Sequence, residues 1–289
     1  MKHLGSIEEA FAACDATCFS GCFHGAIERM LHNSDALPDE TDHLDPELIA
    51  SVVKNLCKPE KLKDTSNFFI RECIHGTGHA VLYTLDYDLN QALQLCDLFD
   101  ENDRSTCYSG VFMENITASD RSKRHLKSNN ILYPCTAVAD AYKSACYYFQ
   151  PSVMMERGLT SDQISAICND MRYADDCFDG YGRELDMSVR QGDPDYARHV
   201  CEDLAGSHWQ RCIVGLLKTA IGTNKNGESA YTYCSAIHSQ EYKSFCLQSV
   251  GSLFNWSFGW DTARVLEDCH TFAGQGSALC ADVVRGVGQ

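Results

Sequence analysis

The chain has 289 residues, of which 44% are hydrophobic and 10% aromatic, as is typical of a folded globular protein. Its formal net charge of -16 and pI near 5.0 disfavour binding to nucleic acid or to an anionic membrane, because an acidic surface repels phosphate groups. The sequence has no apolar run long enough to span a bilayer, so no membrane span is expected.

Seventeen cysteines indicate the compartment in which the protein works. Ordered cysteine pairs are typical of secreted or periplasmic chains, whereas so many free thiols would be an oxidation hazard in the cytosol. The first residues lack the apolar core of an export signal. We therefore predict an extracytoplasmic protein whose export signal is absent from this chain.

Residues 6–32 are predicted to form a helix-rich first unit that contains three cysteines, Cys14, Cys18 and Cys22. We expect Cys14 to pair with Cys22, which leaves Cys18 as a free thiol, a partner for another chain or a metal ligand. Residues 33–56 form an acidic insertion with two prolines. A solvated surface loop is favoured there over a calcium site, because the ligand spacing of an EF-hand is absent.

From residue 57 onward the cysteines fall into close pairs, and the second member of each pair recurs every 31 to 39 residues. A period of this length is typical of stacked helical hairpins. The first cysteine of a pair belongs to a predicted helix A, a short polar or glycine-bearing link follows, and the second cysteine lies in a helix B. The pairs are Cys57 with Cys73, Cys96 with Cys107, Cys135 with Cys146, Cys168 with Cys177, Cys201 with Cys212, Cys234 with Cys246, and Cys269 with Cys280.

The predicted fold is therefore all-α, with about eight disulfide-stapled helical hairpins that form an α-solenoid or a closed α/α superhelix. We expect one helical-repeat domain over residues 1–289. It comprises the first unit at 6–32, the acidic insertion at 33–56, repeats with a predicted metal site at 57–117, a basic insertion at 118–134, and further repeats at 135–289.

The period and the cysteine placement over residues 57–289 resemble those of tetratricopeptide and Sel1-like repeats, especially the cysteine-rich secreted kind. The diagnostic residue patterns of these families are not cleanly present. The resemblance implies an α-solenoid with a binding groove and transfers no functional residues.

Three further features of the repeats carry expectations of their own. Glycine follows the second cysteine by three residues in five units, which favours close packing of a neighbouring helix; these are Gly25, Gly76, Gly110, Gly180 and Gly215. The basic insertion at 118–134 is read as a salt-bridging loop rather than a docking patch. Asn115 and Asn255 begin glycosylation sequons, and the second is followed by alternating aromatic residues that are either core or groove lining.

One motif occurs twice in register with the cysteines. Cys22-Phe-His-Gly-Ala-Ile-Glu28 and Cys73-Ile-His-Gly-Thr-Gly-His79 place His24 and His75 two residues after the cysteine. In the third unit Ser109 takes the place of the histidine, and a carboxylate follows at Glu114. Residues four apart share a face of a helix, so His75 and His79 are expected to lie side by side.

Equivalent positions of stacked helices lie next to each other in a solenoid, which predicts a metal site formed by the first three repeats. Imidazole and carboxylate ligands suit zinc, iron or copper without selecting among them, so the expected cofactor is a divalent transition metal. Glu28 and Glu114 are the candidate catalytic bases, and Tyr83 and Tyr108 are expected around the ligands. The predicted ligands are His24, Glu28, His75, His79 and Glu114.

Two functions follow from these patterns. The first is an extracytoplasmic metal-dependent enzyme, an oxidoreductase or a hydrolase, that acts on a small molecule or a peptide. The zincin family is excluded because Gly76 stands where its motif requires glutamate. The alternative is a non-catalytic disulfide-rich solenoid that binds a protein or glycan partner.

Overall fold

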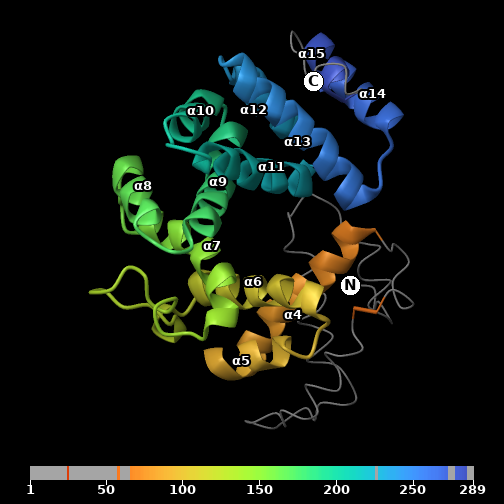
Figure 1. The fold of residues 1–289 in the computed structure, drawn as a ribbon. Coiled ribbons are helices and arrows are strands. Elements are labelled where there is room, and N and C mark those ends of the chain that lie inside the picture. The colour runs from red at the N-terminus through yellow and green to blue at the C-terminus, as the bar shows by residue number, and fades with distance from the viewer. Residues whose placement is uncertain (1–24, 26–56, 59–65, 225–226, 273–276, 285–289) are drawn as a thin grey trace. The chain divides into compact units, whose positions relative to one another are not determined.

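The computed structural model describes residues 25, 57–58, 66–224, 227–272 and 277–284. These residues form helices without any named strand, which confirms the all-α prediction for this part of the chain (Figure 1). The first unit at 6–32 and the acidic insertion at 33–56 lie outside the described residues, apart from Gly25, and so do Cys14, Cys18 and Cys22.

Short and long helices alternate as the cysteine spacing predicts, except between α6 and α7. There Cys135 lies in a turn and not in the predicted helix A, so the prediction is wrong for this unit. The short A helices are α5 (Leu89–Cys96), α8 (Ser161–Asn169), α10 (Pro194–Glu202), α12 (Glu228–Ala236) and α14 (Thr262–Phe272). The B helices are α4 (Asn67–Thr84), α6 (Glu101–Thr117), α7 (Asp140–Glu156), α9 (Ala174–Arg190), α11 (His208–Asn224), α13 (Gln240–Phe258) and the shorter α15 (Ser277–Val284). A 3₁₀ helix, η3 (Arg121–Lys123), lies in the basic insertion.

Local sequence explains where several A helices begin. The side chains of Asp88 and Asp193 accept hydrogen bonds from the backbone N–H groups of the first turns of α5 and α10. Thr160 forms a reciprocal capping box with Gln163 at the start of α8. Such caps satisfy N–H groups that have no partner within the helix, and each contributes about 1 kcal/mol.

All seven cysteine pairs predicted from residue 57 onward are disulfide bonds in the structure. The Cα atoms of the pairs are 5.4 to 5.8 Å apart, a spacing that suits a disulfide without backbone movement. Each bond from Cys96 onward joins neighbouring segments of one hairpin, and the sulfur-bearing side chains are buried. The prediction of disulfide-stapled hairpins is therefore confirmed for the described residues.

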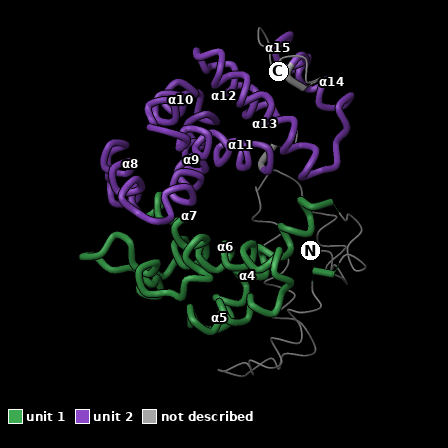
Figure 2. The backbone as a smooth tube through the Cα atoms, in the orientation of Figure 1, with its two compact units in different colours: residues 1–153 green, residues 154–289 purple. Residues whose placement is uncertain are grey.

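The chain divides into two compact units, residues 1–153 and 154–289 (Figure 2). In the first unit α4 packs against α6, and in the second α9 packs against α11. The prediction of a single repeat domain over 1–289 stays a prediction. No helix among the described residues is long and apolar enough to cross a membrane.

Two pairs of glycines let the B helices of each unit approach closely. A Cβ atom on Gly78 would overlap the carbonyl oxygen of Cys107, and one on Gly110 would overlap the carbonyl oxygen of His75. The second unit repeats this contact with Gly182 against Cys212 and Gly215 against Asp179. The expectation that glycine marks close helix packing is thus confirmed at Gly110 and Gly215. At Gly25 a Cβ atom would meet nothing within 4 Å, and for Gly76 and Gly180 the expectation stays a prediction.

These equivalent contacts identify α4 with α9 and α6 with α11 as two copies of one packing arrangement, offset by 104 or 105 residues in sequence. The copies share their framework and differ in the side chains around it. Comparing them therefore separates what the fold requires from what each unit has added.

Candidate functional site

Three of the five predicted ligands come together between α4 and α6. The Nε2 atoms of His75 and His79 are 3.2 Å apart, because the two residues are one helical turn apart on α4. The Nδ1 atom of His79 lies 3.0 Å from Oε2 of Glu114 on α6. His24 and Glu28 lie outside the described residues.

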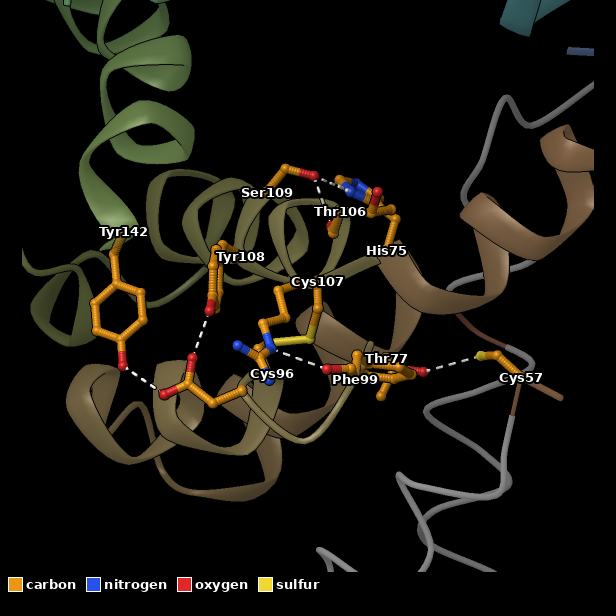
Figure 3. The surroundings of a disulfide bond; sticks show 12 residues. Cys57, His75, Thr77, Cys96, Phe99, Thr106, Cys107, Tyr108, Ser109 and Tyr142 are labelled. Carbon is orange, nitrogen blue, oxygen red and sulfur yellow. Dashed lines mark hydrogen bonds between the residues drawn. A yellow bond between two sulfur atoms is a disulfide. The ribbon is translucent and has the colours of Figure 1, made fainter. Parts of the chain in front are cut away.

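Two residues that were not predicted as ligands complete the cluster. His75 Nδ1 lies 2.9 Å from the hydroxyl of Ser109, which itself donates to the carbonyl of Thr106 (Figure 3). The hydroxyl of Tyr87 donates to Oε1 of Glu114 at 2.7 Å. The result is a continuous hydrogen-bonded chain, Ser109–His75–His79–Glu114–Tyr87, which we call the histidine chain.

The direction of these hydrogen bonds follows from their acceptors. Because Ser109 donates to Thr106, its oxygen accepts from His75 Nδ1, and the carboxylate of Glu114 accepts from His79 Nδ1 and from Tyr87. The facing Nε2 atoms of His75 and His79, 3.2 Å apart, are within hydrogen-bond distance and join the two halves of the chain.

Burial alone would raise the pKa of Glu114, but the hydrogen bonds from His79 and Tyr87 outweigh it and lower the pKa below its ordinary value of 4.5. The carboxylate is therefore charged at neutral pH. Its side chain is 19% exposed and that of His79 is 11% exposed, so this ion pair is largely shielded from solvent.

The prediction of a metal-binding enzyme is contradicted by this geometry. Within the ranges that the structure describes, no group of three or more His, Cys, Asp or Glu side chains could hold a metal ion. The physical reason is the placement of Glu114, which lies at Nδ1 of His79 and not beside the two facing Nε2 atoms, with both oxygens already in hydrogen bonds. The geometry of these residues likewise gives no support to a zinc, iron or copper cofactor.

Tyr83 and Tyr108, expected around the ligands, have different surroundings. Tyr83 is 46% exposed, and its ring meets that of Tyr87 edge to face. Tyr108 donates its hydroxyl to Asp97, which also accepts from Tyr142 at 2.8 Å (Figure 3). Burial and the adjacent carboxylate raise the pKa of Tyr142 to about 12, so this cluster ties α5, α6 and α7 together through neutral hydroxyls.

The turn between α4 and α5 is built differently from its equivalents. Asp86 and Tyr87 have φ values of 49° and 66°, and they are the non-glycine residues with positive φ in the described chain. At the ends of α7, α9 and α13 the positive φ falls on Gly158, Gly192 and Gly259. A left-handed conformation of a residue with a side chain costs about 1 to 3 kcal/mol, and such strain gathers at functional sites.

The basic insertion holds this turn. Nε2 of His125 donates to the carbonyl of Tyr87 at 2.7 Å, and the backbone N–H of His125 donates to the buried side chain of Asn115 on α6. Lys123 forms an ion pair with Asp86 at 2.6 Å. The insertion is thus a salt-bridging loop, as predicted.

At the equivalent positions the second unit has ion pairs instead of imidazoles. Asp179 corresponds to His75 and pairs with Lys218 at 2.6 Å, and Arg183 corresponds to His79 and contacts Glu184 at 2.5 Å. The histidine chain, the left-handed turn and the insertion are therefore additions of the first unit to a shared framework.

Sequence reasoning missed Tyr87 and His125. Tyr87 lies in the turn after α4 and His125 in the basic insertion, so neither occupies a repeated helical position that could have identified it. Ser109 had a usable signal, since it occupies the position of His75 in the next repeat. Comparison of the chain with family models, curated proteins and solved structures finds no match.

Proposed function

We propose that this protein is an extracytoplasmic helical-repeat protein that binds a protein partner through an exposed stripe of its B helices. The extracytoplasmic location is supported by the seven disulfide bonds, which persist in oxidising compartments. The binding role is supported by the pattern of buried and accessible positions that the B helices share.

The B helices share a constant buried framework. Counted from the second cysteine of each pair, positions 0, +1, +4 and +8 are buried in every B helix from α4 to α13. This spacing places them on one face, which packs into the core.

The opposite stripe, at positions +2, +6 and +10, stays accessible and differs in every helix. We call it the accessible stripe, and His79, whose whole-residue exposure is 9%, is the only one of these residues that is buried. Its residues are His75, His79 and Tyr83 on α4, Ser109, Met113 and Thr117 on α6, Tyr148, Ser152 and Glu156 on α7, Asp179, Arg183 and Met187 on α9, Val214, Lys218 and Gly222 on α11, and Gln248, Ser252 and Trp256 on α13.

A constant framework beneath a variable accessible face is the arrangement by which repeat proteins present binding surfaces. Position +10 carries a large exposed side chain in three helices, Tyr83 at 46%, Met187 at 48% and Trp256 at 49% exposure. Aromatic residues and methionine are enriched at protein interfaces. Stripes of neighbouring helices also meet within a unit, as His75 and Ser109 show.

The test is site-specific cross-linking on the secreted, oxidised protein. A photoreactive amino acid is placed at Met187 or Trp256, and at Tyr196 as the control, since Tyr196 is 41% exposed but lies on an A helix. A partner that couples at 187 and 256 but not at 196 is then purified, and its affinity is measured for the wild type and for the Met187→Ser, Trp256→Ser double variant.

We expect the double variant to lose at least about 30-fold in affinity, because the loss of one interface anchor costs about 2 kcal/mol. Its melting temperature should match that of the wild type, since both side chains are exposed. Equal coupling at Tyr196, or equal affinity of the double variant, would refute the proposal. Coupling to glycan in place of protein would assign the stripe to the other class of partner.

A further inference from the structure

The histidine chain is connected to the basic insertion through a single residue, Tyr87. Its hydroxyl donates to Glu114, and its carbonyl accepts from His125. The same residue has a left-handed backbone, with φ of 66°. The position of its ring and the hydrogen bond from the insertion therefore depend on one backbone conformation.

The insertion is anchored at points other than this turn. The N–H of His125 donates to Asn115, and Arg124 donates to the carbonyl of Ala118. Farther along, the buried Gln150 on α7 donates to the carbonyl of Ile131 at 2.6 Å. These hydrogen bonds hold the insertion independently of the turn. The side chains of His125 and Lys123 extend from it to contact the turn.

The equivalent turns after other B helices form without a left-handed residue that carries a side chain. In α7 and α9 a glycine takes the left-handed position, and the N–H of the residue after it bonds back across the helix end. The same backbone bond is present from Tyr87 to the carbonyl of Leu82. The α4 turn is contacted by the basic insertion, through His125 and Lys123.

We infer that residues 121–125 form a strap whose His125 and Lys123 side chains hold the Asp86–Tyr87 turn in its left-handed conformation and so keep the histidine chain closed. Removing the strap's hydrogen bond lets the turn relax and withdraws Tyr87 from Glu114. His79 then loses its fixed orientation, and the imidazoles of His75 and His79 become available on the accessible stripe. The strap rests on the proposed function only for this last consequence.

His125→Ala is the first variant to examine, because it removes the side-chain bond to Tyr87 and leaves the backbone bond to Asn115. We expect amide hydrogen exchange at Asp86, Tyr87 and Asp88 to accelerate about tenfold. The nitrogen-15 signals of the His75 and His79 rings, which report where the ring protons reside, should lose their wild-type pattern. His125→Gln, which retains a side-chain donor, should restore both properties in part.

Tyr87→Phe separates the two ends of the connection. It removes the hydroxyl on Glu114 but keeps the backbone and its bond from His125, so we expect altered His79 signals with wild-type amide exchange in the turn. Lys123→Ala removes the ion pair with Asp86 at an exposed position. The same exchange and histidine measurements are made on this variant if His125→Ala does not fold. Its matched control is Lys218→Ala, which removes the equivalent class of ion pair with Asp179 in the second unit.

The strap is refuted if His125→Ala, or Lys123→Ala where His125→Ala does not fold, leaves turn exchange and the histidine signals unchanged. It is also refuted if Lys218→Ala changes them equally. These measurements need no binding partner. The two proposals can therefore fail separately. Absence of partner binding would refute the accessible stripe and not the strap, and unchanged exchange and histidine signals would refute the strap and not the stripe.

Discussion

At the residue scale, the best-defined interaction of the first unit is the ion pair between Glu114 and His79. The carboxylate is mostly buried and accepts two hydrogen bonds, so its charge is compensated where solvent cannot do so. A neutral isostere at this position would keep the shape of the side chain and remove the negative charge that accepts the hydrogen bonds from His79 and Tyr87.

Glu114→Gln should therefore lower the free energy of unfolding by about 1 to 3 kcal/mol at neutral pH, the range for hydrogen bonds to charged groups. The pKa of Glu114 is lower in the folded state than its ordinary value of 4.5, so its contribution is complete above that value and is lost as pH falls through the lower, folded pKa. Urea denaturation at neutral pH and at pH well below 4.5 checks this.

The two unfolding curves should converge in acid. As a control, Glu241→Gln changes an exposed carboxylate at the start of α13 and should have a much smaller pH-dependent effect. A difference between wild type and Glu114→Gln that stays constant across the pH range would contradict the assignment.

At the element scale, the glycine contacts decide how closely the B helices pack. Gly182 and Gly215 bring α9 and α11 together until each backbone touches the other, so a single methyl group has no space there. Overpacking of a tight interface costs about 1 to 3 kcal/mol and occasionally more, because backbone must move.

Gly182→Ala should destabilise the protein by about 3 kcal/mol, measured by chemical denaturation. Gly192→Ala is the matched control, because Gly192 has open space around it and only the cost of its positive φ, about 1 to 2 kcal/mol. An equal loss in both variants would show that α9 and α11 do not make the close contact described.

The disulfides are the second determinant at this scale. The bond between Cys201 and Cys212 closes a segment with a sequence separation of 11 and ties α10 to α11. Replacing both cysteines by serine should cost about 3 kcal/mol, because the unfolded chain regains the entropy that the bond removes.

The measurement is the urea midpoint of the Cys201→Ser, Cys212→Ser double variant under non-reducing conditions. Mass spectrometry of the unreduced protein confirms that the other pairs remain intact. Unchanged stability would mean that the hairpin is held by packing alone.

At the scale of the whole molecule, stability is distributed over many small hairpins, each with its own covalent bond. A hairpin of about 35 residues cannot bury enough apolar surface to be stable by itself, so it depends on its neighbours and on its disulfide. Oxidation is therefore a condition for the fold of the described chain.

Full reduction should abolish cooperative thermal unfolding and most of the helical circular dichroism at physiological temperature. The check is a thermal scan of the native protein with and without reductant, followed by reoxidation. A reduced protein that still melts cooperatively near the native temperature would show that the core suffices without its disulfides.

The sequence by itself determined what depends on short spacings along one chain: the helical hairpins outside the unit of Cys135, the cysteine pairing, and the contact of His75 with His79 across one helical turn. Helix geometry fixes such neighbours whatever the rest of the fold does. The proximity of Glu114 could also be predicted, because equivalent positions of stacked helices lie side by side.

Only the tertiary structure decided that Glu114 lies at Nδ1 of His79 and not beside the facing Nε2 atoms, which leaves no metal-binding group among the described residues. It also decided that Tyr87 and His125 belong to the same cluster. The direction of these side chains depends on how closely α4 packs against α6, which Gly78 and Gly110 set. It also depends on the Asp86–Tyr87 turn, which residues distant in sequence contact. The spacing of residues along one helix specifies neither the packing distance nor the turn conformation.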